Sequence, residues 1–240
     1  MTEQEFIKKN RRSFLIAGAS VFLGALGLRW VFTNMDEDAT PSLLRKGFQA
    51  NENFWKRFYN PKRENLVAEP AAGTKVRVNG DIGLSDDIDL NDWILEYESP
   101  IMKKTFTLQD LAKFPRVKSQ SEFRCIEGWS LPIGYEGVRF SDFLNAIDPA
   151  ALKFPYVGME TPGADYYVGV DMESMLHSQT ILADRMNGAP LGKEHGEPLR
   201  LIIPIKYGIK SLKRVGRIFV SSERPRDYWA ENGYDWYSGL

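Results

Sequence analysis

The sequence contains very few cysteines and histidines, the residues that form disulfides and most tetrahedral zinc sites. Cys125 is the only cysteine in 240 residues, so no internal disulfide can form, and cysteine usage says nothing about the compartment. With only two histidines, His177 and His195, a tetrahedral zinc site is nearly excluded. The glycine patterns of a Rossmann fold and of a P-loop are also missing, which excludes the usual phosphate-binding loops.

The chain also lacks an excess of charge of either sign. It has 31 Lys+Arg residues and 32 Asp+Glu residues, for a formal net charge of -1. Without a positive field over the whole molecule, we expect no nucleic-acid partner. Apolar residues make up 43% of the chain, which is enough for one sizeable core, so a single domain with appendages is predicted.

One long apolar run stands near the N-terminus. Basic residues at 8–12 precede about 19 mostly apolar residues, enough to span a bilayer. The motif "RRSFL", residues 11–15, resembles a twin-arginine signal, which exports folded proteins. Acidic residues rather than a small-residue cleavage site follow the run. We therefore expect residues 1–35 to be a twin-arginine signal retained as a single-pass inner-membrane anchor, with the body on the periplasmic face. A cleaved signal is the alternative.

The rest of the chain shows short strands, turns and a few short helices. Residues 36–72 are predicted to be a linker and arm whose aromatic residues dock on the body. Strands are expected at 75–80, 92–99, 118–126, 153–161, 165–171, 199–205 and 215–222, and helices at 106–114, 139–147 and 172–178. This mixture predicts an α+β fold with a mixed sheet in a domain over 73–225, followed by a C-terminal tail over 226–240.

Two of the helix starts can be predicted more closely. Thr107 is followed by Asp110 three residues later, a capping-box pattern, and Pro115 should stop that helix. Ser141 is the expected N-cap of the helix at 139–147.

The stretch "SEFRCIEGWS", residues 121–130, contains the single cysteine. Cys125 ends a strand-like run just before Gly128, where a rigid scaffold usually presents reactive groups. A lone cysteine is most often a small buried hydrophobe. Arg124 would favour the thiolate, and Glu127 would serve as a proton donor or acceptor. From the residues alone, a buried filler, a nucleophile and a soft metal ligand therefore all stay open.

A second stretch, residues 197–220, accumulates positive charge. Its apolar strand runs into Pro204, and five cations follow within twelve residues, namely Lys206, Lys210, Lys213, Arg214 and Arg217. Such a run is usually a solvated face. Its place beside glycines after a buried-looking strand also fits the phosphate of an anionic cofactor.

Together, "FRCIEGWS" and "GEPLRLIIPIKYGIKSLKR" resemble the sulfite-oxidase-fold molybdopterin enzymes, in particular the twin-arginine-exported methionine sulfoxide reductases of the MsrP (YedY) type. The resemblance covers residues 50–225. It implies a sulfite-oxidase fold with mixed β-sheets and short helices, with molybdopterin and molybdenum as cofactors.

The resemblance also implies roles for particular residues. Cys125 would ligate molybdenum through its thiolate, and Glu127 would be the acidic residue beside the metal. The positions that match molybdopterin-binding residues of the family are Thr161, His195, Arg200, Ser211, Leu212 and Lys213, and in the arm Asn53, Trp55 and Lys56. Two positions depart from the family pattern, because His195 replaces a frequent asparagine and Tyr135 replaces a frequent tryptophan.

The activity implied by the resemblance is reduction of a sulfoxide, with methionine sulfoxide in proteins as one such substrate. Electrons would come from a haem-containing membrane partner, which the N-terminal anchor would keep close. Oxidation on the same cofactor, as in a sulfite dehydrogenase, is one alternative. A membrane-anchored, non-catalytic binding module with Cys125 merely packed is another.

Overall fold

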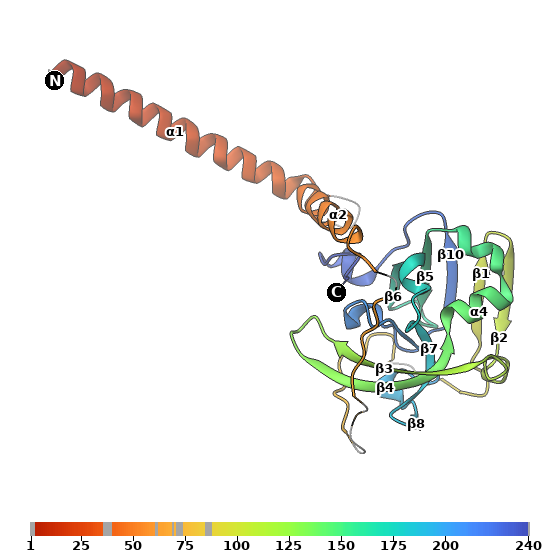
Figure 1. The fold of residues 1–240 in the computed structure, drawn as a ribbon. Coiled ribbons are helices and arrows are strands. Elements are labelled where there is room, and N and C mark those ends of the chain that lie inside the picture. The colour runs from red at the N-terminus through yellow and green to blue at the C-terminus, as the bar shows by residue number, and fades with distance from the viewer. Residues whose placement is uncertain are drawn as a thin grey trace. The chain divides into compact units, whose positions relative to one another are not determined.

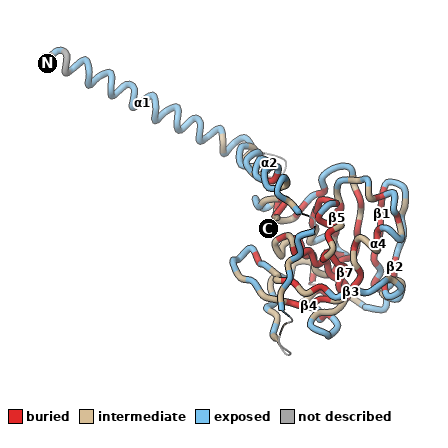
Figure 2. Tube along the Cα trace, in the orientation of Figure 1, coloured by how far each residue is buried: buried red, intermediate tan, exposed pale blue. Residues whose placement is uncertain are grey.

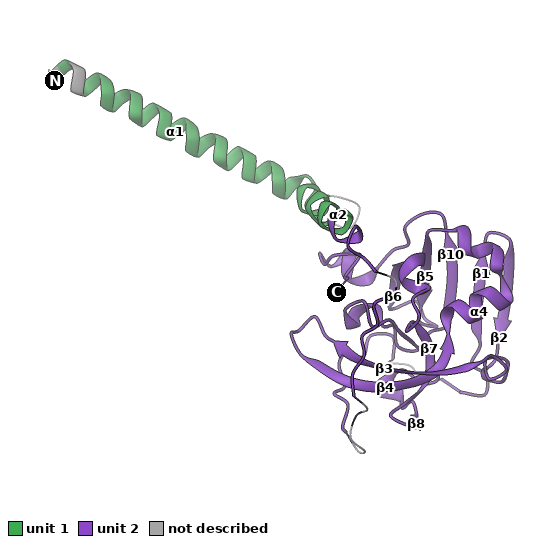
Figure 3. Ribbon diagram, in the orientation of Figure 1, with its two compact units in different colours: residues 1–53 green, residues 54–240 purple. Residues whose placement is uncertain are grey.

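The computed structural model describes residues 3–35, 40–60, 62–68, 70, 74–84 and 88–239. The chain forms two compact units, residues 1–53 and residues 54–240 (Figure 3). The first unit holds α1, Glu3–Thr33, and most of α2, Ser42–Lys56. Within α1, Ile7–Thr33 is long and apolar enough to cross a membrane by length and composition.

Part of the segment predicted to be a linker is a helix. The 15-residue α2 lies inside the predicted linker and arm, 36–72. At its end, the rings of Phe54, Trp55 and Phe58 contact one another, with centroids 5.3, 5.3 and 6.0 Å apart. These residues are nevertheless 51%, 57% and 65% exposed. These three rings contact one another and stay about half exposed or more, and their docking on the body stays a prediction.

The first sheet of the second unit has the strand order β2-β1-β10-β5-β6 (Figure 1). Its strands are β1 Leu95–Ser99, β2 Met102–Phe106, β5 Tyr156–Glu160, β6 Tyr167–Asp171 and β10 Arg217–Ser221. Strands β1 and β10 pair in parallel, whereas the other neighbours are antiparallel. The expected mixed sheet is confirmed.

The second sheet has the order β3-β4-β7-β8, and β9 also pairs with β7. Its strands are β3 Arg116–Arg124, β4 Ser130–Arg139, β7 Ile181–Met186, β8 Ala189–Pro190 and β9 Arg200–Ile202. The register of the β3–β4 hairpin ends at the pair Arg124 and Ser130. The turn that joins these two strands therefore holds residues 125–129.

Short helices connect the strands. They are α3 Leu108–Leu111, α4 Phe140–Ile147, α5 Met172–Met175 and α6 Tyr228–Glu231, with 3-10 turns η1 Pro149–Lys153, η2 Lys193–His195 and η3 Gly208–Lys210. The capping box of Thr107 and Asp110 is confirmed at α3. The predicted N-cap Ser141 is wrong, because α4 starts at Phe140 after Arg139, which makes no side-chain cap hydrogen bond.

The strand expected at 75–80 is also wrong. This segment is extended but has no place in either sheet, because its groups bond to loops instead, as described below. Conversely, β2, β4 and β7 were not expected. The sequence of β4, "SLPIGYEGVR", contains proline and two glycines, which normally argue against a strand.

The buried apolar residues of the second unit form one large cluster and two smaller ones. Phe143 on α4 is fully buried and contacts the rings of Tyr97, Phe106 and Phe114. Buried residues follow the strands of both sheets in Figure 2. This rigid scaffold positions the loops at the ends of β3 and β9.

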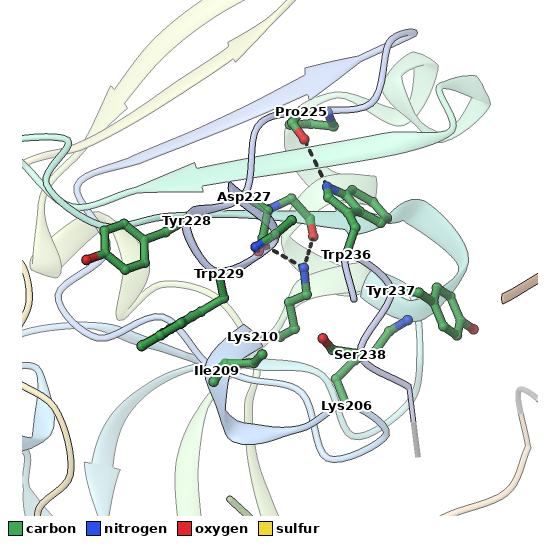
Figure 4. A network of polar contacts seen from close by, with 12 residues as sticks. Lys206, Ile209, Lys210, Pro225, Asp227, Tyr228, Trp229, Trp236, Tyr237 and Ser238 are labelled. Carbon is green, nitrogen blue, oxygen red and sulfur yellow. Dashed lines mark hydrogen bonds and ion pairs between the residues drawn. The ribbon is translucent and has the colours of Figure 1, made fainter. Parts of the chain in front are cut away.

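Two buried lysines tie the loop after β9 to the rest of the unit (Figure 4). Lys210 donates to the carboxylate of Asp227 and to the Gly169 carbonyl, 3.0 Å away. Lys206 donates to Asp171 at 3.0 Å and lies over the ring of Tyr237. Lys210 is 1% exposed and Lys206 is 3% exposed. Because both ammonium groups are paired with carboxylates, the cost of burying their charges is compensated.

Candidate functional site

The single cysteine lies in the tight turn between β3 and β4. The Cys125 N–H donates to the Trp129 carbonyl at 2.9 Å, and the Gly128 N–H donates to the Cys125 carbonyl at 3.1 Å. Gly128 has a φ of 85°, which glycine adopts at little cost. The prediction that Cys125 follows directly on a strand end is confirmed, and its residue exposure is 6%.

The thiol has one polar neighbour that the sequence did not predict. The side-chain amide of Asn79 donates from Nδ2 to Cys125 Sγ over 3.3 Å. The two residues are 46 positions apart in the chain. Asn79 and Gly80 form a dipeptide typical of a turn, but that signal does not reveal which distant group the asparagine side chain meets.

The same segment binds two other predicted cofactor residues, and we call residues 77–83 the strap. Lys213 Nζ donates to the carbonyls of Asn79 and Gly80, at 2.9 and 2.8 Å. Gly83, with a φ of 73°, packs against Thr161 so closely that a Cβ atom would lie 2.5 Å from Thr161 Cγ2. The strap therefore joins Cys125, Lys213 and Thr161, which come from three distant parts of the chain.

Arg200 and its neighbours form the other side of this group. Arg200 starts β9 and is 4% exposed, and it donates to the carbonyls of His195 at 3.1 Å and Ser211 at 3.5 Å. Lys213 donates to the Glu194 carbonyl at 2.7 Å. Gly196, with a φ of 95°, allows this approach, because a Cβ there would lie 2.6 Å from Lys213 Cβ. Arg200, Ser211, His195 and Lys213 thus lie close together, and their role in binding a cofactor stays a prediction.

The electrostatics of this group favour an anion. Burial, and then the charge of Arg200, lowers the pKa of Lys213 to about 8. Burial, together with the charges of Arg200 and Lys213, also lowers the pKa of His195 below its ordinary value of 6.5. At neutral pH His195 is therefore a neutral imidazole, which can donate one hydrogen bond and accept another.

This shift predicts a pH dependence of stability. The folded state holds the His195 proton less tightly than the unfolded chain, so acidification through pH 6.5 favours unfolding. The free energy of unfolding should decrease as the pH drops through this window. In His195→Asn the decrease should be smaller, because the variant has no imidazole to protonate. Urea unfolding of both proteins at about pH 7.5 and about pH 5 measures the difference. An identical decrease in both would contradict the assignment.

Glu127 lies at the rim of the turn rather than against the thiol. Its carboxylate accepts a hydrogen bond from Trp129 Nε1 at 3.1 Å and lies 3.6 Å from Arg77 of the strap. Arg77 also lies over the Trp129 ring, 5.0 Å from its centroid. With half of its side chain exposed, Glu127 can exchange protons with solvent.

The five cations after Pro204 do not act as one patch. As described above, Lys206 and Lys210 pair with buried aspartates. Arg217 pairs with Glu98 and Glu160, and Arg214 donates to the Glu197 carbonyl. Among the described residues, no carboxylate lies within ion-pair distance of Lys213. Its ammonium instead donates to the carbonyls of Asn79, Gly80 and Glu194, so it adds positive charge beside Arg200.

The remaining predicted residues lie in other surroundings. Leu212 is fully buried in the core, so only its backbone could face a cofactor. Trp55 belongs to the exposed aromatic cluster of α2, and Lys56 lies over the Tyr237 ring at 5.0 Å. Asn53 is exposed on α2. A cofactor role for these three arm residues stays a prediction.

The residues present fit a metal that arrives in an organic, anionic cofactor. Within the described part of the chain, no three His, Cys, Asp or Glu residues could together hold a metal ion. A metal on Cys125 would therefore need further ligands from the cofactor. Arg200 Nε is buried without a hydrogen-bond partner among the described residues, and such an orphan donor needs an acceptor. A phosphate or pterin acceptor beside Arg200 and Lys213 would satisfy it.

Comparisons with known proteins agree with this arrangement. A protein-family model described as "Oxidoreductase molybdopterin binding domain" matches residues 82–229. The match begins within the strap and includes Cys125, Thr161, Arg200 and Lys213.

Named relatives are similar over most of the chain. A protein named as protein-methionine-sulfoxide reductase subunit YedZ1, from Azospira oryzae, is 29% identical over 95% of this chain and 87% of its own. The catalytic subunit MsrP of protein-methionine-sulfoxide reductase from Campylobacter jejuni is 26% identical over 98% of this chain and 82% of its own. MsrP from Pseudomonas syringae pv. tomato is 32% identical over 56% of this chain and 46% of its own.

A solved structure shares the fold. The sulfane dehydrogenase SoxCD from Paracoccus pantotrophus aligns with a TM-score of 0.52 and 23% sequence identity. The alignment covers 58% of this chain and 40% of that chain. This likeness supports the predicted α+β architecture with mixed sheets.

Proposed function

Since this chain belongs to the family of oxidoreductase molybdopterin-binding domains, it is a molybdenum-dependent oxidoreductase that uses molybdopterin, and we propose that it reduces sulfoxides at a metal held by Cys125. The relatives named as protein-methionine-sulfoxide reductases support this substrate class, including methionine sulfoxide in proteins. The observation that carries the proposal is the strap, which contacts both the only thiol of the chain and the cation Lys213.

Each residue has a role that its surroundings support. The Cys125 thiolate would hold the metal, because a soft thiolate suits transition metals better than an oxygen ligand does. Arg200 would bind an anionic group of the pterin through a charge-assisted hydrogen bond from its unpartnered Nε, and the positive charge of Lys213 would attract the same group. Neutral His195 would donate to the cofactor where relatives of this family often have asparagine. Thr161, Ser211 and the Leu212 backbone would complete the binding surface.

When bound, the cofactor supplies the metal chemistry of oxygen-atom and electron transfer, while the protein binds and orients. Glu127 would deliver a proton to the departing oxygen of the substrate from the solvent side of the turn. Arg77 and Trp129 would hold the Glu127 carboxylate in place for that transfer. The buried turn around Cys125 would keep water from the thiolate.

Oxidation of sulfite on the same cofactor finds less support. A sulfite site would need arginines that are free to bind the substrate anion. Arg124 already pairs with Glu122 at 2.8 Å, and Arg139 donates to Asp142 and to the Ser178 carbonyl. Both guanidinium groups are thus engaged in the protein.

Metal and pterin analysis of the exported protein, followed by a sulfoxide-reduction assay, tests the proposal. Arg200→Ala should remove a charge-assisted hydrogen bond of about 1.5–3 kcal/mol and so weaken pterin binding roughly 10- to 150-fold. Lys213→Ala should also weaken pterin binding, because it removes a positive charge and the three hydrogen bonds that hold the strap and the Glu194 carbonyl. The control Lys104→Ala, at an exposed position of β2, should keep the full pterin content. If all three variants retain equal amounts of pterin, Arg200 and Lys213 have structural roles and do not bind the cofactor. Absence of molybdenum from the wild type would favour the non-catalytic binding module.

Location and electron supply are part of the same proposal. The twin-arginine motif at 11–15 would direct export of the folded, cofactor-loaded protein, and α1 would remain as an inner-membrane anchor with the second unit in the periplasm. A haem-containing membrane protein would then deliver electrons. Holding both proteins in one bilayer raises their effective concentration.

Export and anchoring can be tested by two changes at the N-terminus. Arg11→Lys combined with Arg12→Lys should keep most of the protein in the cytoplasm, since the pathway reads the arginine pair rather than the charge. Lys8→Arg combined with Lys9→Arg is the matched control and should be exported normally. Cell fractionation measures both. In the wild type, N-terminal sequencing should recover a chain that includes α1, and a mature start near residue 35 would refute retention.

A further inference from the structure

We propose that Asn79 tunes the reduction potential of the bound metal by donating a hydrogen bond to the Cys125 thiolate. This inference rests on the proposed function, because it requires Cys125 to be the metal ligand. Asn79 would be a positioning and tuning residue, since it acts on the metal through the sulfur.

The contact itself has the chemistry that such a role needs. A thiolate can only accept hydrogen bonds, so the side chain of Asn79 must present its amide nitrogen to Sγ, as it does at 3.3 Å. Cys125 is 6% exposed, which leaves little room for water to compete for the sulfur. In such a site a single donor has a larger electrostatic effect than in water.

The strap fixes Asn79 from both sides. Lys213 Nζ binds the main-chain carbonyls of Asn79 and Gly80, and Gly83 is pressed against Thr161. The position of the amide is therefore set by contacts that do not involve the thiol. One residue thus links the predicted metal ligand to a cation that is predicted to bind the cofactor.

The expected direction follows from the charge on sulfur. A hydrogen bond draws electron density from the thiolate, so the sulfur donates less to the metal and the more reduced state is favoured. Removing the donor should therefore stabilise the oxidised state and lower the reduction potential. The electron enters the metal from the external donor, and no bond to sulfur is made or broken.

Redox titration of the full-length, cofactor-loaded protein tests the inference. Asn79→Leu keeps the approximate size but removes the donor, while Asn79→Asp keeps the shape and presents an acceptor to the sulfur. Both variants should lower the midpoint potential of the Mo(V)/Mo(IV) couple. For Asn79→Leu we expect a decrease of about 59 mV, which is about a tenfold change in the electron-transfer equilibrium, and for Asn79→Asp a larger decrease. Both should also change the Mo(V) electron paramagnetic resonance spectrum. Asn145→Leu, whose amide bonds the Ser141 carbonyl on α4, should change neither.

The outcomes separate this inference from the function on which it rests. If wild-type protein contains no molybdenum, or if Cys125→Ser keeps the wild-type Mo(V) spectrum, the proposed function fails. If both of those tests succeed but the midpoint and spectrum of the Asn79 variants match those of Asn145→Leu, only this inference fails. Should Asn79→Leu not load the metal, the isosteric Asn79→Asp decides by the same criteria.

Discussion

A Cys125→Ser variant should lose more than about 100-fold of the sulfoxide-reducing activity, because changes beside the direct ligands of a metal already cost roughly 10–100-fold. Serine has nearly the same shape, so the turn between β3 and β4 should persist. Its neutral hydroxyl is a poor ligand for a metal that prefers soft sulfur. The measurements are sulfoxide turnover, molybdenum content and the Mo(V) spectrum of protein exported through its own signal.

The adjacent residue provides the matched control for this change. Ile126 is 38% exposed in the same turn, so Ile126→Ser introduces the same side chain without removing a ligand. This control should keep its metal and most of its activity. If Cys125→Ser retains wild-type turnover and spectrum, Cys125 is a packed residue and the metal lies elsewhere.

Of the variants proposed here, Asp227→Ala should lower the free energy of unfolding the most. It removes the carboxylate that compensates Lys210, which is 1% exposed, and it also removes acceptors from the N–H groups of Gly169 and Ala230. Breaking a buried pair from one side costs about 3–5 kcal/mol. For a domain of this size the melting temperature should fall by roughly 6–20 °C, which calorimetry or fluorescence can follow.

Two further variants show whether the uncompensated charge is the cause. Lys118→Ala breaks an exposed pair with Glu136 at 3.6 Å and should change stability by less than about 1 kcal/mol. Lys210→Met combined with Asp227→Leu removes both charges together and should recover much of the loss. A single Asp227→Ala variant as stable as Lys118→Ala would show that Lys210 finds another partner.

Local sequence signals predicted the features that depend on local interactions. The capping box at Thr107 and Asp110 is a contact between residues three positions apart, so the sequence contains all of it. Cys125 lies where a strand gives way to a loop, as expected, because Gly128 shortly after it marks the turn. The α+β class followed from the spacing of such segments along the chain.

The features that the sequence missed depend on contacts between distant residues. Residues 75–80, which overlap the strap, alternate like a strand, but the carbonyls of Asn79 and Gly80 bond to Lys213 instead of joining a sheet. The Asn79 contact with Cys125 spans 46 positions and leaves no periodic pattern. Similarly, the run of cations after Pro204 does not reveal that Lys210 is buried beside Asp227, whereas Lys213 donates to main-chain carbonyls.

The contacts of the C-terminal segment also determine when the loop after β9 can be completed during protein synthesis. The ribosome makes residues 204–213 before it makes Asp227 or Ser238, whose carbonyl accepts the Tyr207 N–H at 3.0 Å. Until Asp227 has emerged, Lys210 has no carboxylate partner and its burial is unfavourable. We therefore expect this loop to reach its folded conformation only after translation has passed Ser238. Ser211 and Lys213 would take their positions in the cofactor site at the same stage. Cofactor loading would then follow translation of this segment rather than accompany it.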